Sequence, residues 1–385
     1  MTNSKYILQI LLSAPRVYSG LDHLMVETTR AAARNGYTNV CVYVDTMEYM
    51  PQIQQDIEAA GGVVELVRSS KRGMLKDIWR LYRKYHPTIV DTHFMNLIKT
   101  YTAICSLLFG AKHYTHMHSL LGDNVVEYIR KKGYIKRIIL GLHYWLLTLF
   151  SKRVLCVSEA IYREFQSWSY GSCHNVQTMY IGTQLTPPKY TKEEARKLFC
   201  LPQDKIIVTN ISAKEYIKGI DLIISAVSKL KQKGLDILFV HIGGLRSNTI
   251  EQQQYADSLK QLATDLDVED NLVWLGRRSD VQDILPMADI YVHPSRSEGL
   301  GSALLEASIA ALPLIGSKVG GIPEVVHNEL NGLLVDSDSI EQLANAIEKV
   351  LIVDNNYGSN ARDMVYKSFN QTIQAKELLN RYRIG

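Results

Sequence analysis

Short apolar runs rich in β-branched residues alternate with longer helical patterns along almost the whole chain. The short runs have the length and composition of buried strands, and the longer ones have the period of helices. We expect strands at residues 6–12, 40–44, 63–66, 89–92, 112–116, 153–157, 205–211, 237–242, 272–275, 290–293 and 314–316. Strands that alternate with helices build βαβ units, so the sequence predicts an α/β protein with doubly wound parallel sheets.

The alternation is interrupted in the polar segment around Pro187 and Pro188. Two adjacent prolines continue neither a helix nor a central strand, and such segments are typical of exposed linkers. A chain of 385 residues is long enough for two domains with a large core in each. We therefore expect domains at residues 1–185 and 186–365. Open parallel sheets bind ligands beyond the carboxyl ends of their strands, so two such sheets facing each other would form a cleft.

The composition is that of a folded globular protein, with 46 % hydrophobic and 21 % charged residues. Five cysteines, at positions 41, 105, 156, 173 and 200, include no Cys-x-x-Cys pair, which disfavours a disulfide framework and a structural zinc site. The N-terminus lacks a signal-peptide pattern, and the longest nearly apolar run, residues 138–150, is shorter than the roughly 20 residues that span a bilayer. We expect a cytoplasmic protein.

Positive charge is concentrated in the first half of the chain. Residues 1–185 contain 21 lysines and arginines against 13 acidic residues, whereas residues 186–385 contain 22 against 26. A basic segment leads directly into the run 138–150; its cations are Arg130, Lys131, Lys132, Lys136 and Arg137. Such a segment either attaches to an anionic membrane surface, here the inner face, or forms a solvated basic face beside a buried helix. No recognition motif accompanies the charge, so we expect no nucleic acid partner.

Two loops that follow predicted strands place glycine at the start of a helix. Gly20 precedes the helical pattern 21–34, and Lys218 with Gly219 precedes a helical pattern that runs to about Lys233. Free amides at a helix start favour an anion, glycine lets a ligand approach the backbone, and an ammonium there suits a diphosphate. By spacing alone, an ordinary strand-to-helix turn and a surface lysine explain the same residues.

The segment 291–307 carries the strongest signal. After a strand, a loop with two glycines follows, and a helix begins near Ser302, which is a good N-cap residue. This pattern places Glu298 in the loop and Glu306 about one turn into the helix. Carboxylates accept hydrogen bonds from sugar hydroxyls, but two acids at this position could also serve only to complement the positive end of the helix.

The spacing from Glu298 to Glu306, around Gly-Leu-Gly-Ser-Ala-Leu-Leu, resembles the acid-pair motif of retaining GT-B glycosyltransferases, in particular family 4 (glycosyltransferase group 1). Further stretches agree in the same order, namely residues 157–160, 218–219, 273–276, 288–295, 320–325 and 331–335. The resemblance covers nearly the whole chain and is most specific in residues 270–335. It implies the GT-B fold of two Rossmann-like domains facing a central cleft. The N-terminal domain would bind the acceptor and the C-terminal domain the donor, and residues 366–385 would form a helix that crosses back to the N-terminal domain.

The resemblance also implies donor-binding roles for the residues of the acid-pair segment. Glu306 would bind the ribose hydroxyls of a nucleotide-sugar, and Glu298 would bind hydroxyls of the donor sugar. The backbone of Gly299, Leu300 and Gly301 would assist Glu298.

The remaining donor contacts are implied for basic residues. Lys218 would bind the diphosphate, and Arg277 would contact the base. Many members carry an arginine five or six residues before the motif lysine, but Ser212 and Ala213 stand there in this chain. Lys214 is the candidate replacement.

In the first domain, the resemblance places Gly20 in the loop that approaches donor and acceptor. His118 resembles the histidine that lies near the anomeric carbon in many members, although His116 and His118 could equally form a polar strand end. The chain has Ser19-Gly20 where the family usually has two glycines, and Ile181-Gly182 where it has an Asn-Gly turn. These departures concern the acceptor side.

Together these observations predict a retaining hexosyltransferase that moves a sugar from a nucleoside diphosphate sugar, a UDP-sugar by our interpretation, to a hydroxyl. The acceptor would be a glycan or a lipid-linked acceptor in surface polysaccharide or lipid-linked glycan synthesis. His118, Lys218 and Glu298 are the predicted catalytic residues. The matched motifs contain no Asp-x-Asp pair for a divalent cation, so we expect neither a metal nor a cofactor. Two alternatives stay open: a GT-B-like sugar-nucleotide epimerase or hydrolase, and a catalytically silent nucleotide-sugar-binding partner of a larger glycan assembly.

Overall fold

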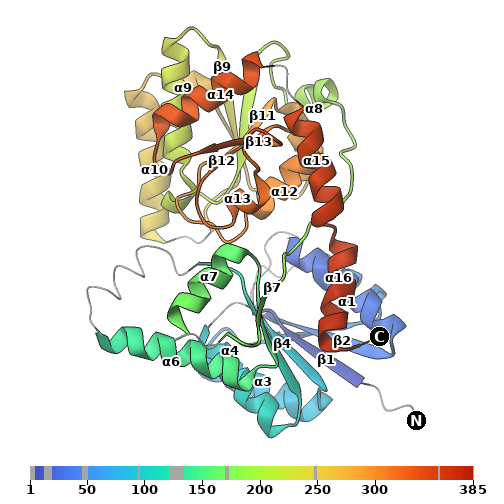
Figure 1. Ribbon diagram of the computed structural model, residues 1–385. Coiled ribbons are helices and arrows are strands. Elements are labelled where there is room, and N and C mark those ends of the chain that lie inside the picture. Colours follow the sequence, from blue (N-terminus) through green and yellow to red (C-terminus); the bar gives the residue numbers. More distant parts are fainter. Residues whose placement is uncertain are drawn as a thin grey trace. The chain divides into compact units, whose positions relative to one another are not determined.

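The computed structural model describes residues 5–12, 20–45, 51–93, 96–120, 134–169, 173–246, 249–353 and 356–384. The chain divides into two compact units. The first consists of Met1–Gln184 together with Asn370–Gly385, and the second of Leu185–Phe369. Each unit contains a parallel sheet with helices on both of its faces (Figure 1). The predicted α/β class is confirmed.

In the described part of the first unit, seven parallel strands have the order β3-β2-β1-β4-β5-β6-β7. Their bounds are β1 Lys5–Ile10, β2 Tyr37–Val44, β3 Val63–Val67, β4 Ile89–Thr92, β5 Lys112–Met117, β6 Arg153–Cys156 and β7 Val176–Thr178. The chain order reverses between β1 and β4, which is the switch point where doubly wound sheets bind ligands.

Helices of the first unit cover both faces of this sheet. They are α1 Gly20–Arg34, α2 Pro51–Ala59, α3 Lys71–Tyr85, α4 Asn96–Leu108, α6 Tyr134–Phe150, α7 Glu159–Trp168 and α16 Gln371–Tyr382. Successive side chains of a strand point to opposite faces. Leu8 accordingly belongs to one core cluster with Ile78 and Tyr82 of α3, and Ile7 belongs to another with Leu378 of α16. The last helix of the chain is therefore part of the core of the first unit.

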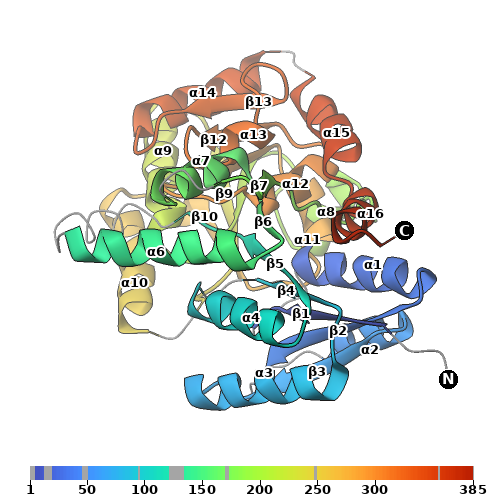
Figure 2. The same ribbon diagram turned by 60° about the horizontal axis from the view of Figure 1, so that its bottom comes forward.

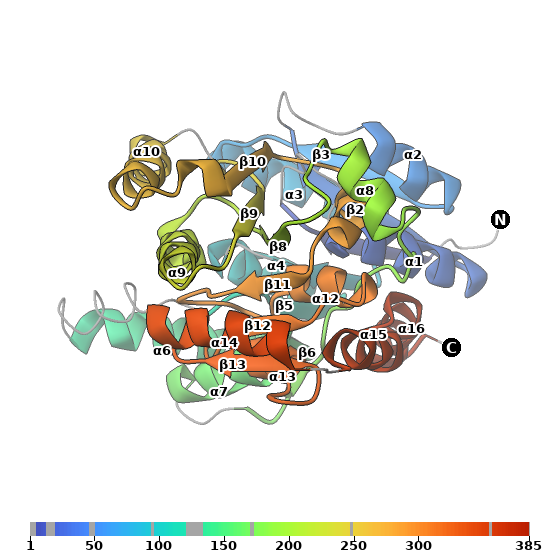
Figure 3. The same ribbon diagram turned by 90° about the horizontal axis from the view of Figure 1, so that it is seen from above.

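In the described residues of the second unit, six parallel strands form the sheet. Figure 3 shows their order, β10-β9-β8-β11-β12-β13. The strands are β8 Ile206–Ile211, β9 Ile237–Ile242, β10 Leu272–Gly276, β11 Ile290–His293, β12 Leu314–Ser317 and β13 Gly332–Val335. The helices are α8 Lys192–Leu198, α9 Ile220–Gln232, α10 Ile250–Asp265, α11 Val281–Ile284, α12 Ser302–Ile309, α13 Ile322–Val325, α14 Ile340–Ile352 and α15 Tyr357–Ser368; short helical turns are η1 Tyr216–Lys218, η2 Glu269–Asn271 and η3 Leu285–Met287. The order reverses between β8 and β11, so the loops after these two strands lie at the ligand-binding switch point.

The eleven predicted strands correspond to β1–β6 and β8–β12, while β7 and β13 were not predicted. Both are short, with three and four residues, and β13 begins with a glycine, so neither has a strong strand pattern. The prediction of Ser302 as an N-cap was wrong. Gly301 holds that position with φ 91°, a conformation that favours glycine, and Ser302 is the first helical residue.

The basic and apolar segment that suggested membrane attachment is only partly described. Helix α6 begins at Tyr134, and Arg130, Lys131 and Lys132 lie outside the described residues. Among the helices that the structure describes, none combines the length and the apolar character that a membrane span requires.

Candidate functional site

The candidate donor site is built on loops at the carboxyl edge of the second sheet. Lys218 ends the turn η1 after β8, Arg277 follows β10, and Glu298 follows β11. The carboxyl ends of parallel strands meet at the same edge of a sheet, and β8 and β11 are direct neighbours. The fold thus brings together loops that are 80 residues apart in the chain.

Lys218 and Glu298 form an ion pair at this edge. The Nζ of Lys218 lies 2.7 Å from Oε2 of Glu298, and the two side chains are only 14 % and 15 % exposed. His293, the last residue of β11, places Nε2 2.9 Å from the same oxygen. Burial by itself would raise the pKa of Glu298, but the hydrogen bond from His293 and the charge of Lys218 hold it well below its usual range. Glu298 is therefore a carboxylate at neutral pH.

His293 was not predicted as a functional residue, although it lies in the segment that carried the strongest signal. Because a carboxylate only accepts hydrogen bonds, His293 donates its Nε2 proton to Glu298. Its Nδ1 lies 3.2 Å from the hydroxyl of Tyr291. A histidine at the end of a strand, five residues before the loop carboxylate, was the available signal.

Arg296 holds the two loops together and was also missed. Its guanidinium forms a hydrogen-bonded ion pair with Asp221 at the start of α9, at 2.7 Å, and a second one with Asp338 at 2.6 Å. It also stacks over the ring of Tyr216 in η1, 3.9 Å from the ring centroid. These contacts fix the loop of Lys218 against the loop of Glu298.

Gly219 permits the close approach of these loops. Its φ of 67° lies in the left-handed region, and a Cβ at this position would come 2.2 Å from the carbonyl oxygen of Pro294. No side chain fits there without movement of the backbone. The packing of the protein itself therefore requires glycine at position 219.

Glu306 lies on α12 and is partly buried. Among the described residues it has no hydrogen bond and no ion pair, and burial raises its pKa to about 7. A carboxyl without a partner in a site of low exposure is a strong acceptor for hydroxyl groups of a ligand.

The other predicted donor-binding residues have distinct surroundings. Lys214 lies with Nζ 3.9 Å from the ring centroid of Trp274, and burial lowers its pKa. Arg277 is exposed and donates a hydrogen bond to the carbonyl of Leu245. The Gly299 amide lies 3.2 Å from Oε1 of Glu298, so it supports the carboxylate. Leu300 is buried, and its backbone role stays a prediction, as does that of Gly301.

Two Asp-x-Asp sequences outside the matched motifs were overlooked in the sequence. They are Asp265-Leu-Asp267 and Asp336-Ser-Asp338. Asp267, Asp336 and Asp338 each form an ion pair, with Lys231, Lys318 and Arg296 respectively.

In the first unit, Gly20 and His118 come from different elements of the fold. Gly20 is the first residue of α1, and a Cβ there would lie 3.7 Å from the carbonyl oxygen of Gly182, an ordinary contact. The packing of the protein does not require glycine at this position, and its role toward a ligand stays a prediction. His118 follows β5 and lies with Nε2 2.8 Å from Nδ1 of His93, which follows β4. His116 on β5 contacts Asp91 on β4 at 2.9 Å.

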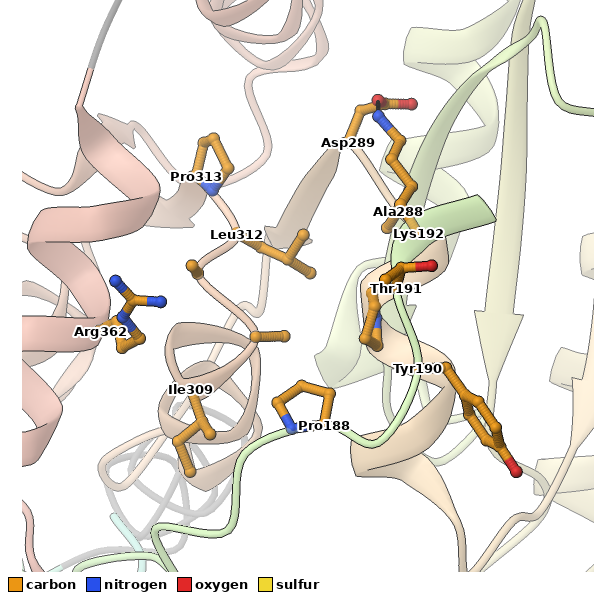
Figure 4. Close-up of a pocket in the computed structure, with 13 residues that line it drawn as sticks. Pro188, Tyr190, Thr191, Lys192, Ala288, Asp289, Ile309, Leu312, Pro313 and Arg362 are labelled. Carbon is orange, nitrogen blue, oxygen red and sulfur yellow. Dashed lines mark hydrogen bonds and ion pairs between the residues drawn. The ribbon is translucent and has the colours of Figure 1, made fainter. Parts of the chain in front are cut away.

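A pocket of about 440 Å³ lies at a different place on the second unit (Figure 4). It includes Asp289, just before β11, and Pro313, just before β12, so it lies at the amino ends of these strands. Lys192, which pairs with Asp289, and Arg362 of α15 are among its lining residues. The pocket therefore lies at the opposite edge of the sheet from Lys218 and Glu298.

With this geometry in place, residues 191–367 match the model of the family described as glycosyl transferases group 1. This part of the chain belongs to that family. The group 1 domain contains Lys218, His293, Glu298 and Glu306, so every residue of the candidate donor site lies within the matched range.

Part of the chain is similar to parts of two glycosyltransferases. A GDP-mannose-dependent alpha-(1-6)-phosphatidylinositol monomannoside mannosyltransferase of Mycobacterium tuberculosis is 30 % identical over 177 residues, which cover 43 % of each chain. A UDP-Gal:alpha-D-GlcNAc-diphosphoundecaprenol alpha-1,3-galactosyltransferase of Escherichia coli is 36 % identical over 109 residues, 28 % of each chain. The alignments thus span less than half of these relatives.

The likeness to solved structures extends over nearly the whole chain. HepE of Anabaena, solved in complex with UDP and glucose, superposes with a TM-score of 0.81 over 99 % of both chains, at 18 % sequence identity. The fold is that of the GT-B glycosyltransferases, as predicted, with two Rossmann-like units.

Proposed function

We propose that the protein is a retaining glycosyltransferase that transfers a sugar from a nucleoside diphosphate sugar to a hydroxyl group. The observation that carries this proposal is the pairing of Lys218 with Glu298 on a group 1 domain that also contains Glu306, which has no hydrogen bond or ion pair among the described residues. A cation and two carboxylates at the carboxyl edge of a parallel sheet offer separate contacts for a diphosphate, a sugar and a ribose.

Lys218 would stabilise the negative charge that develops on the diphosphate as the glycosidic bond breaks. An ammonium has three donors, so the contact with Glu298 leaves donors for phosphate oxygens. The free amide groups at the start of α9 form the positive end of the helix dipole, and they would add to this stabilisation.

Glu298 would accept hydrogen bonds from hydroxyls of the donor sugar, and Glu306 would accept them from the ribose. Binding to the ribose favours the ionised form of Glu306, whose pKa lies at about 7 in the ligand-free protein. Arg277, exposed after β10, would contact the base, and Lys214 would supply a second cation for the diphosphate.

His118 would lie close to the anomeric carbon and bind a substrate hydroxyl. We infer a front-face substitution without a covalent intermediate on the enzyme, in which the leaving phosphate takes the proton of the acceptor hydroxyl. Neither a cofactor nor a metal has a role in this proposal.

The donor that we propose is a UDP-sugar. The solved relative from Anabaena binds UDP and glucose, and the relative from Escherichia coli is named for UDP-Gal. The mycobacterial relative is named for GDP-mannose, so GDP-sugars are the alternative that an experiment must include.

We further propose that the acceptor is a glycan or a lipid-linked acceptor, reached by peripheral attachment to the inner face of a membrane. Helices α4 and α6 pack side by side in the first unit (Figure 2). These two helices expose large apolar side chains, which we call the apolar face: Ile104, Leu107, Leu108, Ile138, Ile139, Leu142, Trp145 and Leu149. Neither 92–122 nor 128–158 contains an acidic residue, and the basic residues 130–137 precede the face. Apolar side chains beside cations suit an anionic lipid surface.

A thermal-shift titration with UDP, GDP, ADP and their common sugars, with and without EDTA, tests the proposal. A ligand at a hundredfold excess over its Kd stabilises the folded state by about 2.7 kcal/mol. We expect stabilisation by uridine nucleotides that EDTA does not change and that Glu306→Ala weakens. Stabilisation by guanosine nucleotides alone would show that the donor is a GDP-sugar and not a UDP-sugar. Loss of the nucleotide stabilisation in EDTA would contradict a metal-independent site.

Turnover distinguishes the two alternatives. Free epimerised sugar or free nucleotide formed without an acceptor would favour an epimerase or a hydrolase. Binding without turnover across glycan and lipid-linked acceptors would favour a silent partner, with the missing arginine at Ser212 or Ala213 as the physical reason.

A further inference from the structure

A chain of buried polar side chains in the first unit connects helix α16 to His118. Tyr382 contacts Asp91, and the Nε2 of Gln9 lies 3.0 Å from the Tyr382 hydroxyl. The Nε2 of His93 lies 3.2 Å from Oε1 of Gln9, and the Nε2 of His118 lies 2.8 Å from Nδ1 of His93. His118 is partly buried and the other four residues are fully buried. We call these five residues the His118 relay.

The direction of the hydrogen bonds follows from the Asp91 end of the relay. Burial by itself would raise the pKa of Asp91, but the neighbouring His116 and the hydrogen bonds from His116 and Tyr382 hold it well below its usual range. A carboxylate only accepts, so the hydroxyl of Tyr382 donates to Asp91. The Tyr382 oxygen is then left to accept from the amide nitrogen of Gln9, which turns Oε1 of Gln9 toward His93.

The proton positions on the two histidines follow in turn. His93 must carry its proton on Nε2, because Oε1 of Gln9 only accepts. Burial lowers the pKa of His93 to about 3 and that of His118 well below its usual value, so both rings are neutral at pH 7. A neutral imidazole has one donor and one acceptor, so Nδ1 of His93 accepts from Nε2 of His118. The acceptor nitrogen of His118 is Nδ1.

We propose that Tyr382 and Gln9 are positioning residues that hold His118 in the tautomer protonated on Nε2, so that its Nδ1 accepts a hydrogen bond from a substrate hydroxyl. The contact with a substrate rests on the proposed function, whereas the tautomer does not. Through Tyr382, the last helix of the chain, α16, thereby determines which nitrogen of His118, the residue after β5, can accept a hydrogen bond.

The same histidines could instead be read as metal ligands. His93, His116 and His118 each offer a nitrogen within 4.8 Å of the others. However, the rings of His93 and His116 are stacked, with centroids 4.3 Å apart and planes 14° from parallel. The lone pair of an imidazole nitrogen lies in the ring plane, so stacked rings direct their lone pairs side by side and not toward one ion. The relay accounts for the arrangement better.

Nitrogen-15 NMR of histidine-labelled protein at neutral pH tests the relay directly, because long-range proton–nitrogen correlations separate the two tautomers of an imidazole. The spectrum of His118→Asn assigns the signals. We expect the Nε2-protonated form in the wild type. In Tyr382→Phe the side-chain amide of Gln9 can turn over and present its nitrogen to His93, which reverses the hydrogen bonds along the relay. The population of the Nδ1-protonated tautomer of His118 should then rise by about fivefold or more, as the loss of one hydrogen bond implies. Gln9→Met removes the acceptor for His93 and should have the same effect.

Tyr114→Phe is the matched control. Its hydroxyl contacts the carbonyl of Arg381 at 3.1 Å and its ring packs on Tyr382, but it is not a member of the relay. We expect no change of the His118 tautomer in this variant. The Nδ1-protonated form in the wild type, or an unchanged tautomer in both Tyr382→Phe and Gln9→Met when these are folded by thermal denaturation, would overturn the inference.

Kinetics then connect the relay to the reaction. We expect Tyr382→Phe to lower kcat by about tenfold with a smaller change in KM, since the donor-binding residues are untouched. If the protein shows the expected His118 tautomer but transfers no sugar, the relay is supported and the proposed function is contradicted. Normal kcat in a variant with the altered tautomer would contradict the role of Nδ1.

Discussion

Lys218 and Glu298 form an ion pair of 2.7 Å although 80 positions separate them in the chain. The pair exists because β8 and β11, the strands before the two loops, are neighbours at the switch point of the second sheet. His293 donates to the same oxygen of Glu298, so the carboxylate is oriented before any ligand binds. The candidate donor site is therefore preorganised by the protein's own contacts, which is the arrangement that favours stabilisation of a transition state.

Removing the cation of this pair should impair catalysis more than folding. We expect Lys218→Ala to lower kcat/KM by about 10²-fold or more, because a charge-assisted contact to a diphosphate is worth roughly 3 kcal/mol. Lys229→Ala on α9 is the control, since Lys229 forms an exposed ion pair with Glu341 away from the site. Steady-state kinetics with the donor found by titration provide the measurement. Equal activities of the two variants would refute the assignment of Lys218.

Replacing Glu306 with glutamine should raise the stability of the folded protein at pH 8 and weaken its binding of nucleotides. Its pKa rises from the usual 4.5 to about 7 in the folded protein, so the folded state binds this proton more tightly than the unfolded chain. The resulting stability is fully present below about pH 4.5 and is lost as the pH rises through 7, up to about 3 kcal/mol. Glu306→Gln lacks this loss, so its Tm should exceed that of the wild type at pH 8 and approach it at pH 5.

The same variant should bind uridine nucleotides about tenfold or more weakly at pH 8, because a neutral amide replaces a charged acceptor. Thermal denaturation and nucleotide titration at both pH values measure the two effects on one protein. A variant that is less stable than the wild type at pH 8, or that binds nucleotide equally well, would show that Glu306 has a structural role instead.

Alanine substitutions at Gly219 and Gly234 separate the cost of backbone strain from the cost of a steric clash. Gly219→Ala places a methyl group 2.2 Å from the Pro294 carbonyl and also imposes a φ of 67° on alanine, whereas Gly234→Ala imposes a φ of 83° with open space around it. We expect Gly234→Ala to cost about 1 kcal/mol from backbone strain alone. Gly219→Ala should cost about 1–3 kcal/mol more and should also lower activity, because it displaces the loop of Lys218. Urea denaturation measures the difference, and equal costs would contradict the close approach.

The meeting of Lys218 with Glu298 could be anticipated from the sequence because both residues lie in short segments with local signals, whereas their roles toward a donor stay predictions. Glu298, Glu306 and Lys218 each stand next to a glycine loop and a helix start, and the strand before each loop has a clear apolar pattern. The strand neighbours β8 and β11 follow from doubly wound topology, so even the meeting of Lys218 with Glu298 is implied by the pattern.

Contacts that depend on tertiary packing could not be predicted in this way. His93 and Gln9 have no motif, and their connection to Tyr382 requires that α16 pack against the first sheet. Arg296 was an unremarkable arginine in the sequence until the fold placed Asp221 and Asp338 beside it. The N-cap of α12 was misassigned because Ser302 has the better local propensity, whereas the loop requires the left-handed backbone that Gly301 supplies.

The apolar face of α4 and α6 gives the remaining prediction, on membrane attachment. Positions 138, 142, 145 and 149 recur at helical spacing on one side of α6, and Leu149 and Leu108 are 55 % and 67 % exposed. Replacement of Leu142 and Leu149 by serine should reduce sedimentation with anionic vesicles about tenfold or more, because each buried methylene contributes about 0.8 kcal/mol. Ile250→Ser with Ile352→Ser is the matched control, since these exposed residues belong to the second unit.

Binding should fall with added salt and should be weak on neutral vesicles, because the basic residues 130–137 contribute the charge. Equal sedimentation of the two double variants would show that this face does not bind the membrane. A monomer–dimer shift on mutation of the face would identify a second copy of the chain as its partner.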